Sequence, residues 1–124
     1  MIESILNKLA STGEHNIITW EELSKMEIGM FLHINEKVTI VKYFETKAQM
    51  GFKTILKAGG CFGVQSHDCL EEILVLRGDL VATQRGNKVY TKGQTVAYLQ
   101  SQVHRPCCTV DSIYKVVFTK SKIQ

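Results

Sequence analysis

The pattern of hydrophobic positions changes once along the chain, from a helical period to a strand-like one. At the start, apolar side chains recur at the i, i+3, i+4, i+7 spacing of one helix face, in Ile2, Ile5, Leu6 and Leu9. Gly13 follows as the expected end of that helix. Thr19 then stands three residues before Glu22, which is the spacing of a capping box and predicts a second short helix over residues 20–26.

From residue 30 onward, short runs rich in Val, Ile, Tyr, Phe and Thr are separated by turn residues, the pattern of an all-β body. The expected strands are 30–34, 38–46, 51–57, 62–67, 72–77, 80–84, 88–90, 95–99, 104–110 and 113–119. Turns are expected at 35–36, 59–60 and 85–87, and the last is the clearest hairpin because Gly86 and Asn87 tolerate positive φ. Pro106 is expected on an edge or at the start of a strand.

Many short strands each have one face to bury, and closing them into a sandwich or barrel is the usual solution. A jelly roll fits this chain best. We expect one domain of 124 residues, with a helical extension over 1–28 and a β-barrel over 29–124. The helices are expected outside the barrel, covering an open edge or end.

Composition narrows the function. A hydrophobic content of 44% with 22% charged residues is ordinary for a soluble globular protein, and no apolar run is long enough to span a membrane. The start of the chain lacks the features of a secretory signal, so a cytoplasmic location is expected. The net charge of +3 comes from dispersed residues rather than a basic stripe, which gives little support to nucleic-acid binding.

The richest stretch for chemistry is 59–78, which holds polar groups between glycine-marked turns and an apolar strand. In a strand, residues two apart point the same way, so Gln65 and His67 are expected to share one face. Glu71 follows four residues after His67, close enough for a turn to bring its carboxylate back toward the imidazole. His104 would have to return on a neighbouring strand, as a rolled sheet allows. Two His and one carboxylate would then meet.

The same residues carry a resemblance to the cupin superfamily. Its first motif is Gly, five residues, His, one residue, His, three or four residues, Glu, six residues, Gly. Here Gly59, Gln65, His67, Glu71 and Gly78 occupy those positions, and four of the five match. The second motif is Gly, five residues, Pro, one, Gly, two, His, three, Asn. Its five positions are occupied by Gly93, Leu99, Ser101, His104 and Cys108, of which only the Gly and the His match.

The resemblance implies the cupin double-stranded β-helix, a jelly-roll barrel, and a divalent metal held inside it by His67, Glu71 and His104. Gln65 stands where complete cupins have a third His, and is expected to bind metal weakly, to orient a water or ligand, or to line the barrel. Glu72 is the reserve for Glu71. Two His and one carboxylate are the ligands of the facial triad of Fe(II) oxygenases, but the same set can hold Zn, Mn or Ni.

Four cysteines are present, without a C-x-x-C pair, and a chain that looks neither secreted nor core-poor gives little support to disulfides. By strand parity Cys61 shares the face of Gln65 and His67, and Cys108 that of His104, so both could line the cavity. Core filling is the favoured role for both, because free Cys packs as a small apolar group.

Three classes of function remain. The first is a metal-dependent enzyme acting on a small molecule, either an oxygenase on Fe(II) or an isomerase or lyase. The second is a non-catalytic module that senses or binds a small molecule or a metal, and the third is an interaction domain with a vestigial site. The resemblance also implies a homodimer, formed through sheet edges and exchanged terminal segments.

Overall fold

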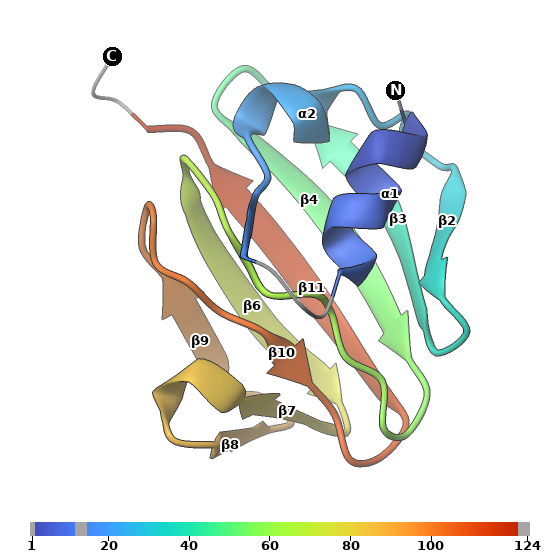
Figure 1. Cartoon of the computed structure of the whole chain (residues 1–124), viewed down its shortest axis with the longest axis vertical. Helices are drawn as coiled ribbons and strands as arrows, with labels where there is room; N and C mark the ends of the chain where they lie inside the picture. The colour runs from blue at the N-terminus through green and yellow to red at the C-terminus, as the bar shows by residue number, and fades with distance from the viewer. Residues whose placement is uncertain (1, 12–14, 122–124) are drawn as a thin grey trace.

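The computed structural model describes residues 2–11 and 15–121 of the chain, and both expected helices are present (Figure 1). They are α1 (Ile2–Ala10) and α2 (Trp20–Ser24). The capping box is confirmed, since the Glu22 backbone N–H donates to the Thr19 hydroxyl and the Thr19 N–H donates to the Glu22 carboxylate. The expected helix end at Gly13 lies outside the described residues.

The remaining elements are short strands, arranged in three sheets. The largest sheet has the order β2-β3-β4-β11-β6-β9, the second has the order β10-β7-β8, and the third pairs β1 with β5. Their bounds are β1 (Asn16–Ile17), β2 (Phe31–Asn35), β3 (Val38–Glu45), β4 (Gln49–Leu56), β5 (Gln65–Ser66), β6 (Leu70–Arg77), β7 (Asp79–Ala82), β8 (Lys88–Thr91), β9 (Thr95–Tyr98), β10 (Pro106–Cys107) and β11 (Ser112–Thr119).

These sheets form a mostly antiparallel jelly roll, as expected, but strand pairing does not run all the way round it. Within the described residues the sheets remain separate, so the closed barrel that the pattern predicted is an open roll. Two isolated bridges, Cys61 with Cys107 and Gln65 with His104, bring the segment before β5 against the segment around β10. These two segments form the wall opposite the large sheet.

Most expected strands occur within a few residues of their predicted bounds. The exceptions are the predicted strands 62–67 and 104–110, whose regular pairing covers only β5 and β10. Pro106 begins β10 at the edge of its sheet, as expected. Gly86 and Asn87 have φ of 67° and 61° between β7 and β8, which confirms that turn. The pattern did not predict β1, which pairs in parallel with β5.

The two helices lie over one end of the large sheet (Figure 1). Leu9 of α1 and Leu23 of α2 are buried and point into the apolar core, together with Ile18 after β1. Gly63 fixes the contact between this N-terminal segment and the wall, because a Cβ there would lie 2.1 Å from the Ser11 carbonyl oxygen. The N-terminal segment therefore closes an end of the roll, in agreement with the expected outside packing.

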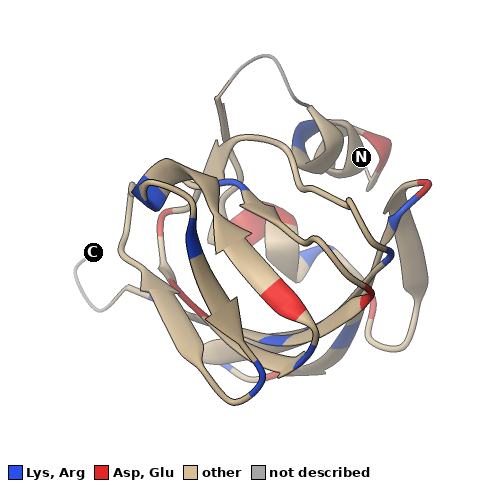
Figure 2. Cartoon of the chain, turned by 90° about the horizontal axis from the view of Figure 1, so that it is seen from below, with Lys and Arg blue, Asp and Glu red and all other residues tan. Residues whose placement is uncertain are grey.

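Charged side chains are dispersed over the surface. Seen from below, Lys and Arg occur on separate strands and loops, interspersed with Asp and Glu (Figure 2). No helix within the described residues is long and apolar enough to cross a membrane.

Candidate metal centre

Three buried side chains meet inside the roll: His67, Glu71 and His104. The Nε2 atom of His67 lies 3.1 Å from Oε1 of Glu71, and the Nε2 atom of His104 lies 2.7 Å from the same oxygen. The three atoms all lie within 4.8 Å of one another. The structure thus brings together the three residues that the motif spacing singled out.

His67 is oriented by the N-terminal segment. Its Nδ1 lies 2.9 Å from the Ile18 carbonyl oxygen, which can only accept a hydrogen bond. Nδ1 must therefore carry the proton, and in the neutral imidazole the Nε2 lone pair faces Glu71. Ile18 is held in place by its own N–H, which donates to the Ser66 carbonyl. The unpredicted strand β1 thus helps to set the tautomer of His67.

His104 is oriented in the same way from the opposite segment. Its Nδ1 lies 3.1 Å from the Gln102 carbonyl oxygen, so its Nε2 also presents a lone pair to Glu71 in the neutral ring. Its backbone N–H and carbonyl pair with the carbonyl and N–H of Gln65 at 2.8 and 3.0 Å. This reciprocal pairing is the long-range contact that brings His104 to the stretch containing His67 and Glu71.

The three facing atoms need a positive charge between them. Although the distances are short, His67 Nε2, His104 Nε2 and Glu71 Oε1 have no hydrogen-bond partner of acceptable geometry among the described residues. Such buried acceptors cost free energy unless a proton or a metal ion joins them. Convergent lone pairs from two imidazoles and a carboxylate are the donor set of a divalent transition-metal site. The residues present therefore fit such an ion.

Without an ion, the electrostatics already favour a charged pair. Burial disfavours a charged Glu71, but His104 and His67 outweigh it and hold the pKa of that carboxyl well below its usual range. Burial likewise disfavours a charged His104, but the Glu71 carboxylate outweighs it and raises the pKa of that imidazole. In the metal-free protein a proton on His104 occupies the position that a cation would take.

Aromatic rings pack around the imidazoles and restrict their motion. Tyr98 stacks on His104 with 4.1 Å between ring centroids and 11° between planes, and the Arg85 guanidinium lies 4.6 Å from the Tyr98 centroid on that ring's face. Phe118 meets His67 edge to face at 4.9 Å. Tyr98 and Phe118 are also the cross-strand partners of Glu71, on β9 and β11. Sequence reasoning missed these contacts, which depend on strand register.

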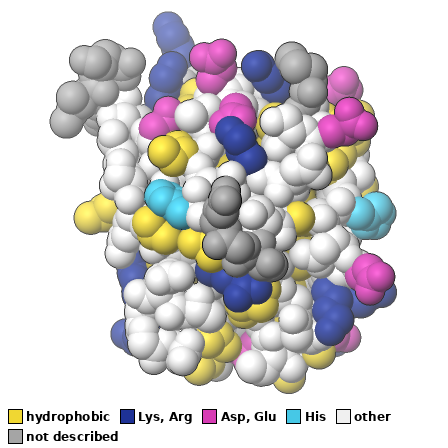
Figure 3. Space-filling model, in the orientation of Figure 1, with side chains coloured by type: hydrophobic (Ala, Val, Ile, Leu, Met, Phe, Trp, Pro, Cys, Tyr) yellow, Lys and Arg dark blue, Asp and Glu magenta, His cyan; other side chains and the backbone are white. Residues whose placement is uncertain are grey.

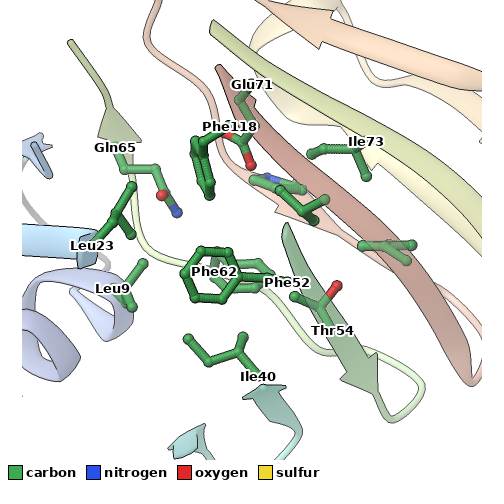
Figure 4. Close-up of a pocket in the computed structure, with 13 residues that line it drawn as sticks. Leu9, Leu23, Ile40, Phe52, Thr54, Phe62, Gln65, Glu71, Ile73 and Phe118 are labelled. Atoms are coloured by element: carbon green, nitrogen blue, oxygen red, sulfur yellow. The ribbon is translucent and has the colours of Figure 1, made fainter. Parts of the chain in front are cut away.

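A small cavity of about 30 Å³ adjoins the carboxylate (Figure 4). Its wall is mostly apolar and comes from both helices and five strands as well as the segment before β5: Leu9, Leu23, Ile40, Phe52, Thr54, Phe62, Gln65, Glu71, Ile73, Pro106, Tyr114, Val116 and Phe118. Gln65 points into this space, and its amide nitrogen donates to the Gly63 carbonyl at 3.3 Å. Gln65 therefore lines the cavity beside the three-residue cluster.

The alternatives from the sequence lie elsewhere. Glu72 is exposed on the outer face of β6, so it does not reach the cluster. His15 contacts the Ser66 hydroxyl at 2.7 Å, and His33 contacts the Thr39 hydroxyl at 2.9 Å. Neither of these histidines belongs to the buried group.

The prediction for the cysteines was wrong in one respect. Cys61 does not fill the core as a free thiol, because it forms a disulfide with Cys107, 46 residues away. Cys108 is free and buried, and its thiol donates to the Lys57 carbonyl. Neither Cys61 nor Cys108 lines the cavity beside Glu71. The parity argument failed because the backbone is regular strand only over β5 and β10.

Comparison with solved structures decides the fold. An RmlC-like cupin from Shewanella frigidimarina NCIMB 400 superposes with a TM-score of 0.66 and 17% identity, over 80% of this chain and 93% of that one. The chain has the cupin fold. KdgF from Halomonas sp. gives a TM-score of 0.66 at 12% identity, over 76% and 88% of the two chains. An acetylacetone dioxygenase from Acinetobacter johnsonii gives 0.63 at 14%, over 77% and 71%. No family model and no curated protein matches the sequence.

The cupin fold explains the positions of the motif glycines. Gly78 has φ of +80°, and a Cβ on it would lie 2.2 Å from the Ser112 hydroxyl oxygen. A side chain is therefore excluded at the sharp turn between β6 and β7. That turn ends the strand which carries Glu71, so the glycine helps to fix where the carboxylate stands.

Proposed function

We propose that this cupin-fold chain binds one divalent metal ion through His67, Glu71 and His104 and uses it as an enzyme acting on a small molecule. The observation that carries the proposal is the convergence of the three buried acceptor atoms, with both Nδ1 protons already committed to carbonyl oxygens. A bound ion would supply Lewis-acid polarisation of a substrate oxygen or, as Fe(II), reaction with dioxygen. Fe, Mn, Ni and Zn are the candidates.

The protein's own residues would position the substrate and exclude water. Phe52, Phe62 and Phe118 offer an apolar wall, and Leu9 and Leu23 cover the cavity from the helical side. Gln65 adds one neutral amide at the edge of the cluster. One structural neighbour is named as an acetylacetone dioxygenase, which supports metal-dependent chemistry on a small oxygen-containing molecule.

Metal analysis of purified protein tests the assignment directly. The wild type is expected to hold about one ion per chain, and Glu71→Gln and His104→Ala are expected to lose it. The chain offers matched controls, because Glu72 is the exposed neighbour of Glu71 and His33 is an exposed histidine on β2. Glu72→Gln and His33→Ala should keep the ion. A wild type that takes up no ion, and gains no thermal stability from any of the four metals, would refute the proposal.

A non-catalytic binding module is the second candidate, and one observation favours it. Apart from Glu71, the titratable group on the cavity wall is the Tyr114 hydroxyl, which donates to the Asp79 carbonyl. The described wall therefore offers no second side chain placed for acid–base catalysis. Oxygen consumption by the Fe(II)-loaded protein with pentane-2,4-dione as probe separates the two, because turnover requires an enzyme, whereas binding without turnover of this probe favours the module.

We also propose a homodimer joined at the free edge of the large sheet. β2 is the last strand on that side, and Phe31 at its start is 61% exposed. An unpaired strand edge beside an exposed aromatic ring is a ready surface for a second copy. The face in Figure 3 shows hydrophobic side chains only in small patches among polar ones, which favours the edge over that face. Phe31→Asp should give monomers by light scattering, whereas Val89→Asp, at an exposed site on β8, should leave dimers.

A further inference from the structure

The cavity holds a polar group that the proposed metal centre does not use. Thr54 lies on β4 among inward-facing apolar residues, with Phe52 before it and Leu56 after it. It is 3% exposed, and its hydroxyl oxygen has no hydrogen-bond partner among the described residues. The same residue lines the cavity that contains Glu71 (Figure 4). A hydroxyl in this position costs stability that a valine of the same shape would not.

Thr54 is too far from the metal centre to serve it. On β11, Thr54 pairs with Tyr114, whereas Glu71 pairs with Phe118. Four residues of strand separate those two positions, which is about 13 Å along β11. Phe52 and Phe62 lie beside Thr54 in the view of Figure 4, with Gln65 on the far side. A molecule that used both Thr54 and the metal centre would need two polar ends separated by an apolar body.

Charge limits what that molecule can be. A divalent ion held by one carboxylate and two neutral imidazoles leaves the centre with one positive charge, and the cavity wall has no Lys or Arg among the described residues. A monoanion bound at the ion would make the whole site neutral, whereas a second negative charge would be buried without a partner. A sugar would bury several hydroxyl groups against a wall that offers two further polar side chains, Thr54 and Gln65.

We propose that the cavity binds a short aliphatic carboxylate with a polar group at its far end. The carboxylate occupies the open side of the metal centre, the chain packs on Phe52 and Phe62, and the distal group hydrogen-bonds to the Thr54 hydroxyl. Thr54 is then a specificity residue, and its unpaired state in the ligand-free protein is the stability given up for selectivity. This inference rests on the proposed function, because the ion balances the charge of the carboxylate.

Calorimetry on the metal-loaded protein tests the proposal with ω-hydroxy acids of three to six carbons, each compared with the acid that lacks the hydroxyl. At the best-fitting length the wild type should prefer the hydroxy acid by about five-fold, the value of one neutral hydrogen bond. Thr54→Val should lose this preference while keeping its metal, and should be at least as stable in urea as the wild type. Thr54→Ser should keep the preference. Thr95→Val, at an exposed position on β9, is the matched control and should behave as wild type.

Each outcome decides one of two questions. If the wild type holds one ion per chain but shows no hydroxyl preference at any length, or if Thr54→Val keeps the preference, the role of Thr54 is refuted and the metal proposal stands. If the wild type binds no ion, the metal proposal fails and this inference fails with it. A loss of preference in Thr54→Val with unchanged metal content supports both.

Discussion

The Cys61–Cys107 disulfide allows a quantitative prediction about stability. Replacing both residues with serine releases a cross-link between positions 46 residues apart. For a loop of this size the chain-entropy model gives about 4 kcal/mol of lost stability. With an unfolding entropy of about 2.1 cal/mol/K per residue, 124 residues give about 0.26 kcal/mol/K, so the melting temperature should fall by roughly 15 °C.

Urea unfolding with and without a phosphine reductant separates the cross-link from the side effects of substitution. Wild type should lose most of the predicted stability on reduction, and the reduced protein should unfold close to the Cys61→Ser/Cys107→Ser variant. The variant itself should not respond to reductant. Mass spectrometry of alkylated protein verifies that the bridge has opened. If the wild-type midpoint does not move once the bridge is open, the disulfide contributes nothing and the reasoning is wrong.

Three further predictions concern other parts of the chain. Thr19→Ala removes the cap of α2 and should cost about 1 kcal/mol in urea unfolding. In EDTA, stability from the charged His104 should be complete below about pH 6.5 and decline as pH rises through its higher folded-state pKa, because the Glu71 carboxylate raises that pKa; urea midpoints from pH 6 to 9 measure this, and a flat profile would contradict it. Burial, with help from Asp68, raises the pKa of Cys69 to about 12, so iodoacetamide at pH 8 should label this thiol only in unfolded protein.

Local patterns predicted most of the fold because most elements follow local rules. The helical spacing of α1, the capping box of α2 and the positive φ of Gly86 and Asn87 depend on residues close in sequence. The element that was missed, β1, is two residues long and exists through its pairing with β5. The disulfide was missed for a related reason, since only the bridge between distant segments brings Cys61 opposite Cys107. Neither pairing has a local signal.

The candidate site could be predicted only as far as the motif reaches. His67, Glu71 and His104 are placed by spacing within two stretches, and the structure brings those stretches together through the Gln65–His104 bridge. The groups that tune the site were not predictable in this way. Ile18 is contributed by the N-terminal segment, and Tyr98 reaches His104 from β9. An inward-facing Thr54 does stand out in the sequence as a polar residue between Phe52 and Leu56, and that signal could have been used.

Gln65 connects the metal proposal with the proposed ligand. It faces the interior opposite His104, and its amide nitrogen is engaged by the Gly63 carbonyl, so its oxygen is the atom left to face the cavity. An amide oxygen is a neutral and weaker ligand than an imidazole, and a centre with Gln65 in this place keeps a coordination position that a third histidine would fill. The charge of the centre is the same in both cases. What the glutamine changes is access, because an anion can reach the ion on the side where the cavity is apolar and Thr54 waits at its far end.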